Sequence, residues 1–90
     1  MDESEEFNVV DKQFEKAFEL FALQVGLKIG YYRRMSGMTQ QELADASGLS
    51  LVYMGQIEAP NAVYPPSLKV LYKLSQAMGI KACLLLDVRI

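Results

Sequence analysis

The 90-residue sequence predicts an all-α fold, a compact domain of four to five helices with an N-terminal helical extension. Two observations predict it. Apolar residues recur at spacings of three and four along most of the chain, and helix-capping residues separate the apolar segments. Residues 80–90 are an exception, because their apolar residues also alternate with period two, so a C-terminal β-strand is an alternative there. A chain of this length is expected to bury one modest core, which dimer formation would stabilise.

The longest apolar stripe predicts one helical face between residues 14 and 35. Asp11 suits the N-cap of this helix, and Gly37 suits the position after its last residue. Gly26 and Gly30 lie inside it, where each costs about 1 kcal/mol relative to alanine. Either the helix breaks near residues 24–26 or these glycines let another helix approach closely. The stripe consists of Phe14, Phe18, Phe21, Val25, Ile29, Tyr32 and Met35.

Two short helices joined at "SGLS" are predicted next, and together they have the features of a helix-turn-helix spanning residues 39–58. Thr39 and Glu42 form a T-x-x-E capping box, which starts the first of the two helices. Gly48 ends it, Ser50 caps the second, and Pro60 stops that second helix. Their predicted inward residues are Leu43, Ala44, Ala46 or Ser47, Leu49, Met54 and Ile57.

A fourth helix and a short tail complete the prediction. Ser67 caps the fourth helix and Gly79 follows its end. The tail either forms a fifth helix centred on residues 84–86 or forms the β-strand. Within the tail, Cys83 is predicted to be a small buried hydrophobic side chain. The inner face of the fourth helix is predicted to hold Leu68, Leu71, Leu74, Ala77 and Met78.

Charge divides the chain into two parts. Residues 1–20 carry seven acids and two lysines, a net of −5, whereas residues 21–90 carry four acids and seven bases, a net of +3. The acidic composition predicts a disordered leader over residues 1–12, followed by the domain over residues 13–90.

Composition excludes several classes of function. The sequence has no histidine and one cysteine, which removes histidine general bases, histidine–cysteine zinc sites and disulfide frameworks. It shows no nucleophile–base pair, phosphate-binding glycine loop or metal-ligand cluster, so we expect no catalytic residue, no metal and no cofactor. It also shows no signal peptide and no apolar run long enough for a bilayer, so we expect a cytoplasmic protein without membrane contact.

Two stretches carry a family resemblance: "GLKIGYYRRMSGMTQQELADASGLSLVYMGQIE" and "PPSLKVLYKLSQAMGI". Together they resemble the Cro/C1-type (XRE-family) helix-turn-helix domain between residues 24 and 86. The most specific matching parts are "TQQELA", Gly48, the Ile57–Glu58 pair and the proline–serine–leucine entry into a leucine-rich helix. The resemblance implies a compact five-helix domain that binds double-stranded DNA as a homodimer and regulates transcription.

The resemblance also assigns roles to residues. It implies a structural salt bridge between Arg33 and Glu58, and a phosphate contact by Gln40 at the start of its helix. Leu51, Val52, Gly55 and Gln56 fall on the base-facing side, with Tyr53 at its flank. Neutral donors position the backbone in such an interface, so the expected DNA-binding set is Thr39, Gln40, Ser50, Leu51, Val52, Tyr53, Gly55, Gln56 and Asn61. Candidate phosphate partners at longer range are Lys28, Arg34, Lys69 and Lys73.

The base-facing positions depart from the family pattern, which is usually polar or basic there. Leu51 and Val52 suit thymine methyl groups, and the side-chain amide of Gln56 suits adenine N6 and N7. The same apolar residues also suit a protein interface. A protein-interaction module on the same fold, which would bind another subunit, a cognate toxin or an antirepressor, is therefore the alternative to a DNA-binding regulator.

Overall fold

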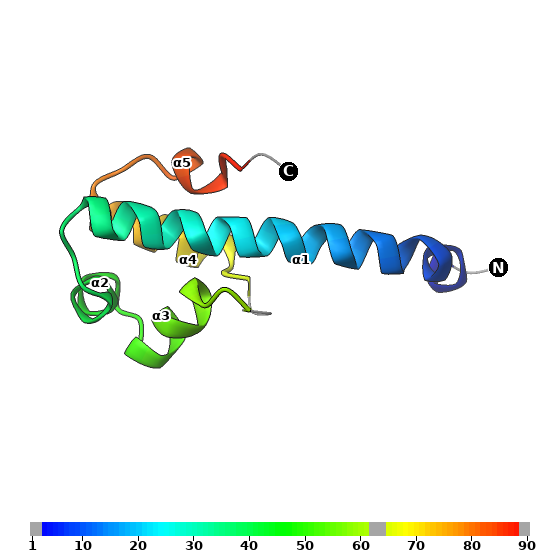
Figure 1. Ribbon diagram of the computed structural model, residues 1–90, viewed down its shortest axis with the longest axis horizontal. Helices are drawn as coiled ribbons and strands as arrows, with labels where there is room; N and C mark the ends of the chain where they lie inside the picture. Colours follow the sequence, from blue (N-terminus) through cyan, green and yellow to red (C-terminus); the bar gives the residue numbers. More distant parts are fainter. Residues whose placement is uncertain (1–2, 62–64, 89–90) are drawn as a thin grey trace.

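The computed structural model describes residues 3–61 and 65–88, with side chains described from residue 11 onward, and these residues form five helices and no strand. Figure 1 shows α1 as a long rod, with α2 and α3 on one side of it and α5 on the other. The helices are α1 (Glu3–Met35), α2 (Gln40–Ser47), α3 (Leu51–Glu58), α4 (Leu68–Met78) and α5 (Cys83–Leu86). None of the helices in this described part is long and apolar enough to cross a membrane.

Helix α1 runs without interruption through both internal glycines, so the predicted break near residues 24–26 is wrong. The other explanation, that the glycines let another helix approach closely, is correct. A Cβ atom on Gly26 would collide with the backbone carbonyl oxygen of Ile57, and one on Gly30 would lie 3.1 Å from the Glu58 carboxylate. The two glycines therefore allow α3 to pack directly on the backbone of α1.

The N-terminal part of α1 differs from its prediction. The helix begins at Glu3, so most of the segment predicted to be a disordered leader is helical, and Asp11 lies inside the helix rather than at its cap. Acidic residues near a helix N-terminus interact favourably with the helix dipole, which opposes the disordering effect of their charge. This part of α1 projects beyond the other helices (Figure 1), and every described side chain from 11 to 20 is exposed.

All five helices contribute to one core. Ile29, Leu43, Met54, Leu74 and Leu85 are each fully buried, and they come from α1, α2, α3, α4 and α5 in turn. Two buried serines, one in α2 and one in α4, hydrogen-bond to carbonyl groups of their own helices. The core therefore contains these hydroxyl groups without leaving them unpaired.

Several residues predicted to face inward are exposed. Leu68, the first residue of α4, is the most exposed large hydrophobic residue among those whose side chains are described, at 78%. Met35, the last member of the α1 stripe, is also exposed. Cys83 is exposed rather than buried, because the single turn of α5 turns only Leu85 fully inward.

The tail forms the helical alternative rather than the strand. Its backbone N–H groups at Leu84 and Leu85 donate to carbonyl oxygens three residues earlier, at 3.1 and 3.0 Å. A strand would need a neighbouring strand to satisfy those groups, and none lies within the residues described. Residues 89–90 of the alternating pattern fall outside that part of the chain.

Candidate functional site

The capping box predicted at Thr39 fixes the start of α2. The Thr39 hydroxyl accepts a hydrogen bond from the Glu42 N–H at 3.0 Å, and the Glu42 carboxylate accepts one from the Thr39 N–H at 2.9 Å. The pKa of the Glu42 carboxyl is lowered, first by the hydrogen bond from the Thr39 backbone and second by hydrogen bonding with the Thr39 side chain. This carboxylate therefore contributes stability above its ordinary pKa of 4.5, and that stability is lost as the pH falls through the lowered value.

The turn between α2 and α3 sets the angle between the two helices. Gly48 has φ 75°, a left-handed conformation that glycine adopts without steric cost. The N–H of Leu49 then donates to the Ala44 carbonyl oxygen at 2.9 Å, which satisfies the end of α2. The Ser50 hydroxyl accepts from the Tyr53 N–H at 3.0 Å and caps α3. Both ends of the turn are thus held by local hydrogen bonds.

Helix α3 presents two chemically different faces. Met54 and Ile57 are buried in the core, and Tyr53 is half-buried against it. On the outside, Leu51 is 45% exposed and Val52 is 72% exposed. The rest of this face comprises Gln56, which is exposed, and Gly55, where a Cβ atom would meet nothing within 4 Å. We call Leu51, Val52, Gly55 and Gln56 the outer face of α3.

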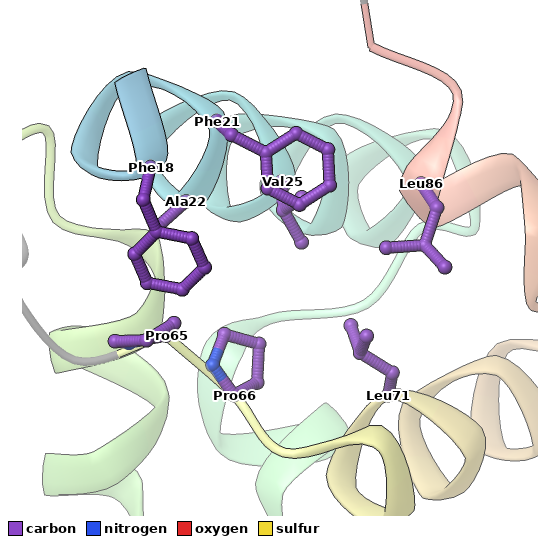
Figure 2. A pocket seen from close by; sticks show the side chains of 8 residues that line it. All are labelled: Phe18, Phe21, Ala22, Val25, Pro65, Pro66, Leu71 and Leu86. Carbon is purple, nitrogen blue, oxygen red and sulfur yellow. The ribbon is translucent and has the colours of Figure 1, made fainter. Parts of the chain in front are cut away.

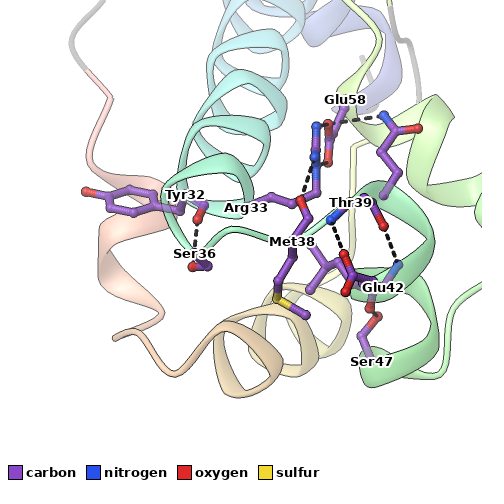
Figure 3. A network of polar contacts seen from close by, with 10 residues as sticks. Tyr32, Arg33, Ser36, Met38, Thr39, Glu42, Ser47 and Glu58 are labelled. Carbon is purple, nitrogen blue, oxygen red and sulfur yellow. Dashed lines mark hydrogen bonds and ion pairs between the residues drawn. The ribbon is translucent and has the colours of Figure 1, made fainter.

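An ion pair connects the end of α1 to the end of α3. The Arg33 guanidinium donates from Nε to Glu58 Oε2 at 2.8 Å and from Nη2 to Glu58 Oε1 at 3.0 Å. A third nitrogen of Arg33 donates to the Met38 carbonyl oxygen at 2.8 Å (Figure 3). The two side chains are only 12% and 7% exposed. Such a charge-assisted, two-pronged pair is directional, and it fixes α3 relative to α1.

The structure places Gln40, the predicted phosphate contact at the start of α2, beside the ion pair. Its amide nitrogen donates to Glu58 Oε1 at 3.2 Å, so this side chain belongs to the ion-pair network. Eighteen residues separate the two partners, and no local pattern signals a contact at that distance along the chain. Arg34 also lies beside this network, because a Cβ atom on Gly30 would be 3.2 Å from an Arg34 nitrogen and 3.1 Å from Glu58.

The other predicted phosphate partners do not gather around α3. Lys28 lies on the face of α1 opposite Gly26 and Gly30, since two residues correspond to a rotation of about 200°, and it lines a hollow with Tyr31 and Tyr32. Lys69 lines a hollow between α4 and α5. Lys73 on α4 and Asn61 beyond α3 are exposed. Among the described residues, no group of histidine, cysteine or acidic side chains is arranged to hold a metal.

This arrangement defines a class of protein: a compact helical domain in which a capped helix, braced by a second helix of the same length, exposes its outer face. A family model described as "Helix-turn-helix" matches residues 29–85. The chain belongs to this helix-turn-helix family, of the Cro/C1 (XRE) type.

The known proteins similar to the chain include a transcriptional regulator and a controller protein of solved structure. An uncharacterized HTH-type transcriptional regulator of Methanocaldococcus jannaschii is 37% identical over 54 residues, which cover 60% of this chain and 79% of the relative. The crystal structure of the restriction-modification controller protein C.AhdI from Aeromonas hydrophila superimposes with a TM-score of 0.65 at 30% identity. That match covers 71% of this chain and 94% of the controller protein.

Proposed function

We propose that the protein is a DNA-binding transcriptional regulator that binds as a dimer through α3. The observation that carries this proposal is the outer face of α3, which is exposed while both ends of the helix are fixed by a serine cap and an ion pair. A fixed, protruding helix of this kind fits the major groove. The similar proteins support it, since one is named a transcriptional regulator and the other a controller protein.

The proposed action is repressor-like and cytoplasmic. Occupation of a promoter by a small domain excludes other proteins from the same groove, and this requires no catalytic step. The helix-turn-helix family is a class of DNA-binding regulators rather than of enzymes, so we propose no enzymatic activity.

Selection from a random pool of duplex DNA with the purified protein tests the proposal. Enrichment of a palindromic site is expected, and a pool that stays random would contradict it.

The outer face of α3 predicts a preference for thymine. Leu51 and Val52 offer methyl groups to the thymine methyl, whereas uracil lacks that methyl and has the same hydrogen-bonding groups. Replacing thymine by uracil in the selected site is therefore expected to weaken binding by about 1 kcal/mol per contacted base. Fluorescence anisotropy of matched duplexes measures the difference. Equal affinities for both duplexes would show that these side chains do not pack on base methyl groups.

Few cations lie near the outer face, so the affinity is expected to depend weakly on salt. Each neutralised phosphate contributes about −0.9 to the slope of log K against log salt concentration. Arg34 is the predicted cationic phosphate partner placed beside the ion pair, so one such contact per subunit gives a slope of roughly −2 for a dimer, and a second contact per subunit gives roughly −4. A titration between low and high salt measures it, and a slope near −8 would reveal a basic surface that contacts DNA elsewhere.

We propose that the dimer forms through α4 and α5. Leu68 and Tyr72 of α4 are strongly exposed, and together with Leu86 they line an apolar hollow between these helices. Exposed apolar patches of this kind mark protein interfaces. Leu68→Ser is expected to convert the dimer to a monomer in analytical ultracentrifugation, whereas Lys73→Ser on the same helix leaves it unchanged. A monomeric wild-type protein would contradict the proposed dimer.

The alternative function uses the same outer face to bind a protein. Leu51 and Val52 favour it, because both are exposed and Glu58 is the only charged residue between Asp45 and Lys69. The DNA selection separates the two functions. The interaction module would be established if the DNA pool stays random and a protein partner binds the wild-type chain but not the Val52→Asp variant.

A further inference from the structure

The projecting part of α1 carries an aromatic stripe that the domain leaves uncovered. Phe14 is 60% exposed and Phe18 is 39% exposed, and their rings stack in parallel with centroids 6.3 Å apart. Phe21 continues the stripe and packs against the core. The stripe precedes residue 29, where the match to the family model begins, so it lies outside the part that the family shares. It is also separate from the outer face of α3.

The stripe leads into an apolar hollow. Phe18, Phe21, Pro65 and Pro66 surround it together with side chains of α4 and α5 (Figure 2). Its volume of about 80 Å³ is roughly half that of an engineered cavity that holds benzene, so it suits the end of one aliphatic side chain. Leu71 and Leu86 line both this hollow and the one between α4 and α5, so the two surfaces adjoin.

Acidic side chains follow one edge of the stripe. Glu15 and Glu19 come directly after Phe14 and Phe18, which places both carboxylates on the same side of the aromatic row. Asp11 continues this row at the same spacing of four residues. Like charges at this spacing repel each other along a helix. Lys12 and Lys16, each three residues before one of these glutamates, offset part of the repulsion, and a row of cations on a partner would relieve the rest.

We infer that the α1 stripe is a docking surface for a basic amphipathic helix of another protein. The partner helix would lay its apolar row along Phe14 and Phe18 and insert one aliphatic side chain into the hollow. Its lysines or arginines, four residues apart, would face Asp11, Glu15 and Glu19. A second copy of the chain fits poorly, because its own residues 1–20 carry the same net charge of −5 and would repel this edge.

The experiment uses the full chain and two synthetic amphipathic helices, a leucine–lysine peptide and its leucine–glutamate counterpart. Fluorescence anisotropy is expected to show that the lysine peptide binds at least about tenfold more tightly. Phe14→Ser is expected to weaken it by about tenfold. Leu20→Ser is the matched control, because Leu20 is 46% exposed on the opposite side of the same helix, and we expect it to bind normally.

Charge reversal makes the test specific. The double variant Glu15→Lys, Glu19→Lys is expected to lose its preference for the lysine peptide and to bind the glutamate peptide more tightly than wild type does. Equal binding of both peptides by wild type, or unchanged binding by Phe14→Ser, would overturn the inference. A dimer that dissociates in Phe14→Ser and persists in Leu68→Ser would also overturn it, because the stripe would then bind a second copy.

Discussion

Glu58→Ala is expected to lower the free energy of unfolding by about 3–5 kcal/mol, the usual cost of removing one partner from a buried ion pair. The substitution leaves the Arg33 guanidinium with only the Met38 carbonyl oxygen, in a site where its side chain is 12% exposed. Gln40 loses its acceptor as well. Urea denaturation followed by circular dichroism measures the change, which is a large share of the stability of a domain this small.

Two further variants determine whether the isolated charge causes the loss. Asp45→Ala removes an exposed carboxylate from α2 and is expected to change stability by less than about 0.5 kcal/mol. The double variant Arg33→Met, Glu58→Leu removes both charges and is expected to recover a large part of the loss. A double variant no more stable than Glu58→Ala would show that the cost comes from lost packing instead.

Gly26→Ala is expected to destabilise the domain by about 2–3 kcal/mol, although alanine is the better helix former. The added methyl group would collide with the carbonyl oxygen of Ile57, and a backbone atom of α3 cannot move aside as a flexible side chain does. Helix α3 must therefore shift away from α1, which also strains the Arg33–Glu58 pair. Thermal unfolding is expected to show a decrease in Tm of about 10 °C or more.

Gly55→Ala is the matched control for Gly26→Ala. It is the same change in a helix interior, but the methyl group would meet nothing within 4 Å, so stability should rise by up to about 1 kcal/mol. Opposite signs for the two variants would establish close backbone packing at Gly26. If both variants stabilise the protein, α1 and α3 do not approach as closely as the structure shows.

Local chemistry made much of the fold predictable. The Thr39 capping box and the Ser50 cap depend on residues three apart, and the structure contains both. The separation of α3 into an inner face at Met54 and Ile57 and an outer face at Val52 follows from helical spacing alone. The Arg33–Glu58 pair joins residues 25 apart, and it was the family resemblance, not local pattern, that implied it.

Long-range packing was beyond the reach of the sequence. Apolar spacing identifies one face of a helix, but it does not say whether another element covers that face. Leu68 was predicted to face inward and is exposed, and Phe14, at the start of the α1 stripe, is exposed as well. The same limit applies to Gln40, whose partner lies on a different helix. Both explanations of Gly26 were compatible with its neighbours along the chain, and only the position of Ile57 distinguishes them.

The way α1 enters the core has a consequence for how such a protein can change in evolution. Among the described side chains of α1, the first buried one is Val25, and those from 11 to 20 are all exposed and lie outside the core. Substitutions in that leading segment therefore leave the core intact, so mutation can alter its partners while selection continues to maintain the domain behind it. Related chains are expected to diverge fastest before residue 21 and slowest where Gly26 meets α3.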